Sequence, residues 1–259
     1  MNIEEMKQHE WVVSWSGGKD STATIILMHE HKIPIKEIAY VRMMYDEELP
    51  ATLPIMTDFV DDTKKVFESW GYKVSFIYPK RNLVEMMSRK YKRSSDPNKN
   101  GKSYGVTALV RGFCNMTDLK QKTIQKFVDE SEGEYQMIGY ASDELERIGR
   151  LGGKKQSIML ELGVKETEAF DICRKYNLLS PLYNVGVGRD GCWFCPNAGK
   201  KQRKMLKEQY PELVSKIYAS IEMCEYMNPT YLNNYSKRNN WVAEYILDKE
   251  HNISHVVRK

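Results

Sequence analysis

The sequence feature that most constrains the fold is a six-residue turn, Ser-Gly-Gly-Lys-Asp-Ser, at positions 16–21. It follows an apolar run at residues 12–15, which has the length of a short buried strand, and it precedes a stretch with helical periodicity at residues 21–31. A strand that passes through a glycine turn into a helix is the start of an α/β unit. The turn therefore predicts a parallel sheet at the centre of the chain.

The same alternation continues beyond the turn. Strands are expected at residues 38–44, 73–78 and 135–139, and helices at 57–70, 117–130, 157–161, 166–176, 200–210 and 212–226. Right-handed crossovers between such strands give a Rossmann-like α/β parallel sheet flanked by helices. We expect a nucleotide-binding domain at residues 1–180, with a basic loop or insert at 80–113. A small, mostly helical region at 181–259 would carry a Cys-x-x-Cys metal site.

The turn has the composition of an anion site. Gly17 and Gly18 let backbone amides face a ligand without a Cβ in the way, and the following helix presents its free N–H groups at the same point. Lys19 adds a full positive charge, and Ser16 and Ser21 add hydroxyl donors. The motif predicts phosphate binding, and a glycine turn capped by a neighbouring side chain is the structural alternative.

The turn is not a Walker A loop. That motif needs glycine at position 13 and serine or threonine at position 20, where this chain has Val13 and Asp20. Instead, the hexapeptide resembles the motif of the PP-loop ATP pyrophosphatases, also called adenine nucleotide alpha hydrolases. That resemblance implies a pyrophosphate cradle that binds ATP with Mg²⁺. ATP-using members cleave between the α- and β-phosphates, and they release pyrophosphate after adenylating a substrate.

Later stretches resemble one branch of this superfamily, the phosphoadenylyl-sulfate (PAPS) reductase-like proteins. The stretches are DEELPATLPIM after the second strand, FCNMTDLKQKTIQKF at 113–127, GYASDELER at 139–147 and SPLYNVGVGRDGCWFCPN at 180–197. Asn115 departs from the usual threonine. The resemblance implies phosphate or Mg²⁺ contacts from loop and carboxylate residues. The candidate catalytic residues are Lys19, Asp20, Asp143 and Glu144, and the candidate nucleotide ligands are Ser16, Gly17, Gly18, Lys19, Asp20, Ser21 and Arg147. A carboxylate pair and an arginine on a solvated helix are the alternatives for Asp143, Glu144 and Arg147.

The five cysteines are typical of metal or redox chemistry rather than disulfides in an intracellular protein. Cys192 and Cys195 are spaced to share one ion. The family resemblance adds Cys114 as a third ligand, with Cys224 as a possible fourth and Cys173 as a buried helical position. A [4Fe–4S] cluster, a structural Zn²⁺ ion and metal-free thiols all fit this spacing, with the cluster placed first.

Charge and hydropathy restrict the partners. Eight Lys or Arg and two acids lie between Lys80 and Lys102, a pattern that fits either a solvated loop or a surface for nucleic acid. No apolar run has the length of a membrane span, and the polar N-terminal residues do not resemble a secretory signal, so we expect a cytoplasmic protein without a membrane partner.

Three functions remain open from the sequence. The first is an ATP pyrophosphatase that adenylates a substrate for sulfur or nitrogen transfer, with nucleic acid as a candidate acceptor. The second is sulfonucleotide reduction, although the closing residues HNISHVVRK lack the Glu-Cys-Gly-x-His pattern of assimilatory PAPS reductases. The third is a non-catalytic module that senses adenine nucleotides and acts through a protein partner.

Overall fold

The structure is a computed structural model that describes residues 1–103, 105–109, 114–131, 135–185, 191–224, 241–242, 244–246 and 248–249. The chain divides into two compact units. The sheet unit comprises Met1–Arg42, Leu53–Pro79 and Lys120–Asp190, and the cysteine unit comprises Met43–Thr52, Lys80–Leu119 and Gly191–Lys259. The boundary at residue 180 stays a prediction from the sequence.

The sheet unit contains a five-stranded parallel sheet in the order β3-β2-β1-β4-β5. Its strands are β1 (Trp11–Trp15), β2 (Ile35–Val41), β3 (Val74–Ile77), β4 (Tyr135–Ile138) and β5 (Lys155–Gln156). The strand order reverses direction between β1 and β4. In open parallel sheets, ligands bind beyond the carboxyl ends of the strands at such a switch point. The loops that follow β1 and β4 are therefore the place to look for a site.

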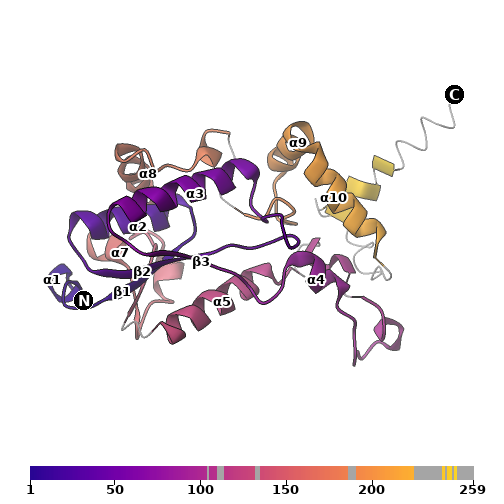
Figure 1. The fold of residues 1–259 in the computed structure, drawn as a ribbon, viewed down its shortest axis with the longest axis horizontal. Helices are drawn as coiled ribbons and strands as arrows, with labels where there is room; N and C mark the ends of the chain where they lie inside the picture. Colours follow the sequence, from indigo (N-terminus) through magenta and orange to yellow (C-terminus); the bar gives the residue numbers. More distant parts are fainter. Residues whose placement is uncertain are drawn as a thin grey trace. The chain divides into compact units, whose positions relative to one another are not determined.

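Helices cover both faces of this sheet. Helices α2 (Lys19–Glu30), α3 (Pro54–Ser69) and α8 (Glu166–Lys175) lie on one side in Figure 1, and α5 (Met116–Glu130) lies on the other. On the first side, Trp15 packs on Tyr40 and on Phe67 of α3, with ring centroids 5.3 and 5.2 Å apart. On the second side, Val128 of α5 packs against Val12 and Ala39. Alternate strand residues thus face opposite layers, as the pleat requires.

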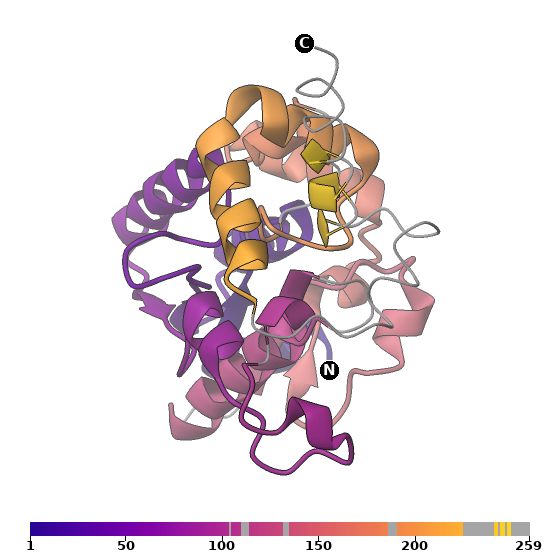
Figure 2. The ribbon, with the colours of Figure 1, turned by 90° about the vertical axis from the view of Figure 1, so that its right-hand side faces the viewer.

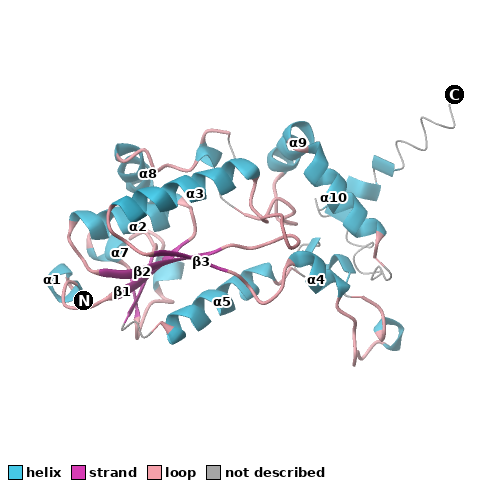
Figure 3. Cartoon of the chain, viewed as in Figure 1, coloured by secondary structure: helices cyan, strands magenta, loops and turns pink. Residues whose placement is uncertain are grey.

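The predicted helices and long strands are confirmed to within a few residues, and several short elements were not anticipated. Strand β2 begins and ends three residues earlier than expected, because Met44 forms an isolated bridge with Pro50 in the cysteine unit. Figure 3 shows how the short elements alternate with loops. The short helix α7 (Ile158–Glu161) was predicted. The short elements that were not predicted are strand β5, the helices α1 (Ile3–Met6), α4 (Leu83–Ser88) and α6 (Leu145–Ile148), and the 3₁₀ turns at Pro97–Lys99, Gly105–Leu109 and Pro181–Tyr183.

The cysteine unit is mostly helical. Helices α9 (Lys200–Gln209) and α10 (Pro211–Glu222) pack together, and both appear in orange in Figure 2. Trp193 and Phe194 of the Cys-x-x-Cys turn are buried and pack on Tyr45, whose hydroxyl lies 2.6 Å from the Ser220 hydroxyl of α10. Among the helices that the structure describes, none is long and apolar enough to cross a membrane.

Candidate functional site

The glycine turn leaves the end of β1 and leads directly into α2. Gly17 adopts a φ of +80°, and a Cβ added there would lie 2.6 Å from the Met56 side chain and 3.2 Å from that of Val60. The backbone conformation therefore favours glycine strongly, and a Cβ would in addition displace the end of the Met56 side chain and crowd Val60. Gly18 has no such contact with α3, and it forms the N-cap of α2 in an extended conformation.

Two serine hydroxyls fix the shape of the turn. The Ser21 hydroxyl accepts a hydrogen bond from the Ser16 amide at 3.1 Å and donates to the Gly18 carbonyl at 3.0 Å. The Ser16 and Ser21 hydroxyls lie 2.9 Å apart. These contacts close the loop on itself and hold the α2 end of the turn against the end of β1.

The N-cap residue of α2 is Gly18, which has no side chain with which to cap the helix. The Lys19 amide donates a long hydrogen bond of 3.4 Å to the Tyr183 hydroxyl. The Ser16 hydroxyl accepts the Gly18 amide at 3.4 Å, whereas the Asp20 carboxylate binds Lys19, so capping by Ser16 stays open as an alternative to an anion site. A helix N-terminus directs partial positive charge and N–H groups at one point, which suits a phosphate group.

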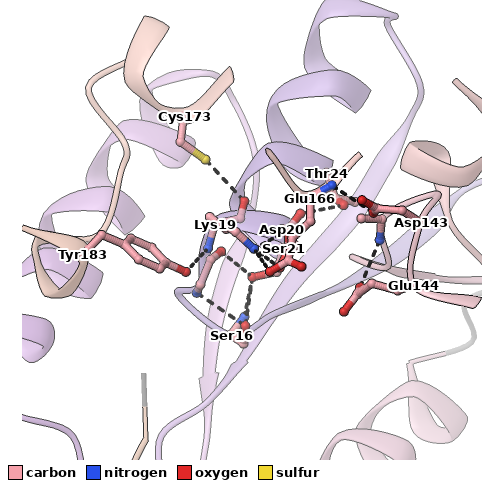
Figure 4. A network of polar contacts seen from close by, with 12 residues as sticks. Ser16, Lys19, Asp20, Ser21, Thr24, Asp143, Glu144, Glu166, Cys173 and Tyr183 are labelled. Atoms are coloured by element: carbon pink, nitrogen blue, oxygen red, sulfur yellow. Dashed lines mark hydrogen bonds and ion pairs between the residues drawn. The ribbon is translucent and has the colours of Figure 1, made fainter. Parts of the chain in front are cut away.

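Lys19 is buried at this point, with 5% of the residue exposed. Its Nζ atom donates to Glu166 Oε1 at 2.7 Å and to both Asp20 carboxylate oxygens at 3.0 Å, as Figure 4 shows. Burial alone would lower the pKa of Lys19, but the hydrogen bonds to Glu166 and Asp20 raise it above its ordinary value. The ammonium therefore stays charged across the physiological pH range.

Asp20 lies between this cation and further acids. Burial raises the pKa of Asp20 above its ordinary value, and the nearby Glu144 and Glu166 carboxylates raise it further, while Lys19 opposes the shift. The Lys19 ammonium is therefore the group that favours the ionised form of Asp20. Glu144 thus lies near the loop, as its assignment to the site requires.

The segment after β4 supplies the other predicted carboxylates. Asp143 Oδ1 accepts the Glu166 amide at 3.0 Å, so it fixes the start of α8. Glu144 accepts the Ala141 amide at 3.1 Å and pairs with Arg147 at 2.7 Å. In this structure Arg147 is directed to a carboxylate beside the site. No group of three His, Cys, Asp or Glu side chains within the described residues is arranged to hold a metal ion.

Gly139 makes the close approach of this segment possible. A Cβ at residue 139 would lie 2.7 Å from the backbone of Ser21 and 2.8 Å from that of Asp20. The end of β4 and the first turn of α2 can therefore touch only because the residue between them has no side chain.

Three residues beside the loop were not expected from the sequence. Glu166 binds Lys19, the Tyr183 hydroxyl receives the Lys19 amide, and the Cys173 thiol lies 3.3 Å from the Lys19 carbonyl oxygen, to which it donates. All three follow residue 160, far from the loop in sequence. Burial raises the pKa of Cys173 to about 12, with a further contribution from Asp20. Cys173 is thus a protonated, buried thiol rather than a ligand or nucleophile.

The other cysteines belong to the cysteine unit. The Cys195 amide donates to the Cys192 carbonyl at 2.9 Å, and the two intervening aromatic side chains are buried, which leaves both cysteines half-buried. Burial raises the pKa of Cys114, and the nearby Cys195 thiol raises it further. Cys114 thus lies near Cys195, as the shared-site prediction requires. Cys224 follows α10 and is half-buried.

These contacts do not amount to a metal centre. In the described part of the chain, no three His, Cys, Asp or Glu side chains are arranged to hold a metal ion. The site predicted at Cys114, Cys192, Cys195 and Cys224 therefore remains a prediction. Arg189, which the sequence places three residues before Cys192, lies outside the described residues.

The basic segment folds back on itself in the cysteine unit. After α4, Lys90 bridges to Ser103 and Tyr91 exchanges backbone hydrogen bonds with Gly101 and Lys102, around a 3₁₀ turn. We call residues 89–102 the basic hairpin. Its exposed cationic residues are Arg89, Lys90, Lys92, Arg93 and Lys102. Tyr104, at its end, lies outside the described residues.

The comparisons with known proteins give a limited result. No protein-family model matches the chain, and no curated protein matches it. Among solved structures, the chain is similar to the U34-tRNA thiolase NcsA from Methanococcus maripaludis with its [4Fe–4S] cluster. The identity is 15%, the TM-score is 0.46, and the match covers 85% of this chain and 75% of the other.

A second solved structure is also similar. It is described as a predicted subunit of tRNA methyltransferase from Methanocaldococcus jannaschii, with 16% identity and a TM-score of 0.34, covering 67% of this chain and 90% of the other. These values are low, so the α/β assignment stands on the sheet order and strand pairing of this chain itself.

Proposed function

We propose that this protein binds ATP at residues 16–21 and cleaves it between the α- and β-phosphates, forming an adenylated substrate and pyrophosphate. The observation that carries this proposal is the first turn of α2, whose N-cap residue is a glycine. It begins at a glycine turn held by Ser16 and Ser21, beside the buried Lys19 cation, at the switch point of the sheet.

Each loop residue has a role in this proposal. The amides after Gly18 bind the β- and γ-phosphates, and the Ser16 and Ser21 hydroxyls add donors to the phosphate oxygens. Lys19 neutralises charge that accumulates on the leaving pyrophosphate. Asp20, the carboxylate of the motif, would help to hold Mg²⁺ with the bound ATP, and the ion would supply further charge neutralisation at the phosphate oxygens.

The proposed reaction has two steps. A substrate oxygen attacks the α-phosphorus and the bond to the bridging α–β oxygen breaks, so pyrophosphate leaves with that oxygen and its electron pair. A sulfur or nitrogen nucleophile then attacks the activated substrate carbon, and AMP leaves with the substrate oxygen. No step is assigned to a metal at the cysteines, because the described cysteines form no three-ligand group.

We further propose that the acceptor is nucleic acid bound through the basic hairpin. Lys90, Lys92 and Arg93 form no ion pair with a described residue, and the hairpin has no large exposed apolar side chain of the kind that a membrane surface would bind. Polyphosphate backbones favour such clusters, and binding to them weakens as salt rises.

Product analysis tests the reaction. The protein would be incubated with ATP labelled at the α- or γ-phosphate, Mg²⁺ and a panel of RNAs, with Lys19→Met as the control. AMP and pyrophosphate in equal amounts, lost in the variant, support the proposal. ADP as the sole nucleotide product contradicts it. Sulfite released from PAPS in a parallel reaction with added thiol would instead indicate sulfonucleotide reduction.

Charge reversal tests the acceptor surface. We expect Lys92→Glu with Arg93→Glu to weaken RNA binding about tenfold or more at moderate salt, since two phosphate contacts are lost and two repulsive charges are gained. Lys200→Glu with Lys201→Glu, two exposed residues of α9 in the same unit, gives the same change in net charge. Equal losses in both pairs would show that net charge, rather than the hairpin, governs binding.

A further inference from the structure

Lys19 is the cation that the proposed reaction needs, and its hydrogen bonds are already taken by carboxylates. Its Nζ atom donates to Glu166 at 2.7 Å and to Asp20 at 3.0 Å. A lysine ammonium has three N–H donors, and it is 5% exposed here. A phosphate group that binds at the loop must therefore compete for Lys19 with carboxylates that the protein itself supplies.

The two carboxylates differ in how they can respond. Asp20 is adjacent to Lys19 in the first turn of α2, so it remains near the lysine in any arrangement of the loop. Glu166 reaches Lys19 from α8, 147 residues further along the chain, and its side chain is 53% exposed. A modest change in its side-chain torsions moves the Glu166 carboxylate into solvent, where water replaces the lost hydrogen bond.

The backbone of Glu166 is fixed while its side chain is not. Its amide donates to Asp143 Oδ1 at 3.0 Å, and the preceding Lys165 amide donates to Glu168 at 2.8 Å. The start of α8 is thus tied to the segment after β4. These contacts hold the Glu166 side chain within reach of Lys19 without burying it, which is the arrangement that a reversible contact requires.

We propose that Glu166 is a positioning residue that competes with bound phosphate groups for Lys19 and so lowers the affinity of the loop for pyrophosphate. The contact keeps the lysine aligned beside the turn. When a phosphate oxygen takes the same N–H donor, Glu166 turns to solvent. The consequence for the reaction is weaker retention of the pyrophosphate product. This inference rests on the anion site of the proposed function and extends it to a residue outside the motif.

Calorimetric titration with inorganic pyrophosphate and Mg²⁺ tests the inference on the intact chain. Glu166→Gln keeps the shape of the side chain and removes its charge, so we expect pyrophosphate to bind about threefold to tenfold more tightly, the range of a partly exposed ion pair. Glu161→Gln, an exposed residue of α7 with the same charge change, is the matched control and should leave the affinity within about twofold. Weaker or unchanged binding in Glu166→Gln would overturn the inference.

A double-mutant cycle shows whether Glu166 acts through Lys19. In a Lys19→Met background, Glu166→Gln should no longer change pyrophosphate affinity, because the shared partner is gone. An equal gain in pyrophosphate affinity with and without Lys19 would point to general repulsion between Glu166 and the anion, and it would overturn the positioning role. If no variant binds pyrophosphate, the inference and the anion site both fail. If the product assay yields ADP instead of AMP, the proposed reaction fails. Tighter pyrophosphate binding by the Glu166→Gln variant would still support this inference.

Discussion

At the scale of single residues, position 17 is the most tightly specified in the loop. Its φ of +80° is unfavourable for any residue with a Cβ, and that atom would collide with Met56 of α3. Strain of this kind costs about 1–2 kcal/mol, and the flexible end of the Met56 side chain would have to shift to admit the added atom. Position 17 is therefore restricted first by its backbone conformation and second by the neighbouring side chains of α3.

We accordingly expect Gly17→Ala to weaken ATP binding by at least about tenfold, because the amides and Lys19 would move relative to each other. Fluorescence titration with an ATP analogue measures this loss. Gly71→Ala is a matched control, since Gly71 also has a positive φ, of +91°, but a Cβ there would meet nothing within 4 Å. Comparable loss of binding in both variants would mean that strain anywhere in the unit, rather than loop geometry, explains the effect.

Gly139 provides a second prediction at this scale. A Cβ there would strike the backbone of Asp20 and Ser21, which cannot move aside as a flexible side chain can. We expect Gly139→Ala to lower the free energy of unfolding by about 2 kcal/mol or more and to weaken nucleotide binding in parallel. Urea unfolding, followed by circular dichroism, measures the first effect. A stable variant that binds normally would show that β4 and α2 can separate without cost.

Residue types in the motif were predictable from the sequence, whereas their partners were not. Two glycines, a lysine and two serines between a strand and a helix are sufficient to indicate an anion site. The contacts of Lys19 with Glu166 and Tyr183 join positions 147 and 164 residues apart, and no local pattern encodes them. An acid in the first turn of α8 is also explained by the helix dipole alone, so Glu166 carried no distinct signal.

At the scale of elements, the packing of α8 on α2 places a thiol in an apolar interface. Cys173 is fully buried, and burial raises its pKa from an ordinary value near 9 to about 12. Below pH 9 the thiol is protonated in both the folded and unfolded chains, so its ionisation does not affect stability. Between pH 9 and 12 only the unfolded chain ionises, and the stability of the folded state falls as pH rises.

This linkage gives a measurable alkaline effect. Between pH 8 and pH 10 we expect the wild-type protein to lose about 1 kcal/mol more unfolding free energy than Cys173→Ala, which has no thiol to ionise. The difference between the two proteins cancels the contribution of tyrosines and lysines common to both. Urea unfolding of both proteins at pH 8 and at pH 10 measures these free energies of unfolding. Parallel losses would show that Cys173 ionises as readily in the folded protein as in the unfolded one.

Elements with a clear period were predictable, and short ones were not. The apolar stripe of α3 extends over enough residues to reveal a helical period, and β1 is recognisable as a continuous apolar run before the glycine turn. Strand β5 has two residues and α4 has six, too few for a period to show. The end of β2 was predicted three residues too late because Met43 and Met44 are apolar and could continue a strand. In the structure their backbone pairs instead with Pro50 and Ala51.

At the scale of the whole molecule, the cysteine unit is assembled from three separate segments of the chain. The Trp193 amide and indole donate to the carbonyls of Ala51 and Pro50, at 2.8 and 2.9 Å. Such a unit depends on contacts between residues far apart in sequence, and its extent could not be recognised from composition. Its basic hairpin was recognisable, because charge density is a local property.

Polar contacts also hold the last described helical residues to this unit. Arg203 of α9 is 1% exposed, and it pairs with Glu244 and donates to the Ala198 carbonyl. Lys207 reaches the same Glu244 at 2.9 Å and Asp248 at 3.0 Å. Removing one member of a buried ion pair costs about 3–5 kcal/mol, because the remaining charge loses its partner without regaining water.

We therefore expect Arg203→Met to lower the local unfolding free energy of α9 and α10 by about 3 kcal/mol, since Lys207 still compensates part of the Glu244 charge. Amide hydrogen exchange in these two helices measures the local effect directly, without assuming that the chain unfolds in one step. Adding Glu244→Leu to Arg203→Met removes the isolated charge and should restore at least half of the loss. A cost below about 1 kcal/mol in the single variant, or no recovery in the double variant, would contradict the role of the Arg203–Glu244 pair in stabilising these helices.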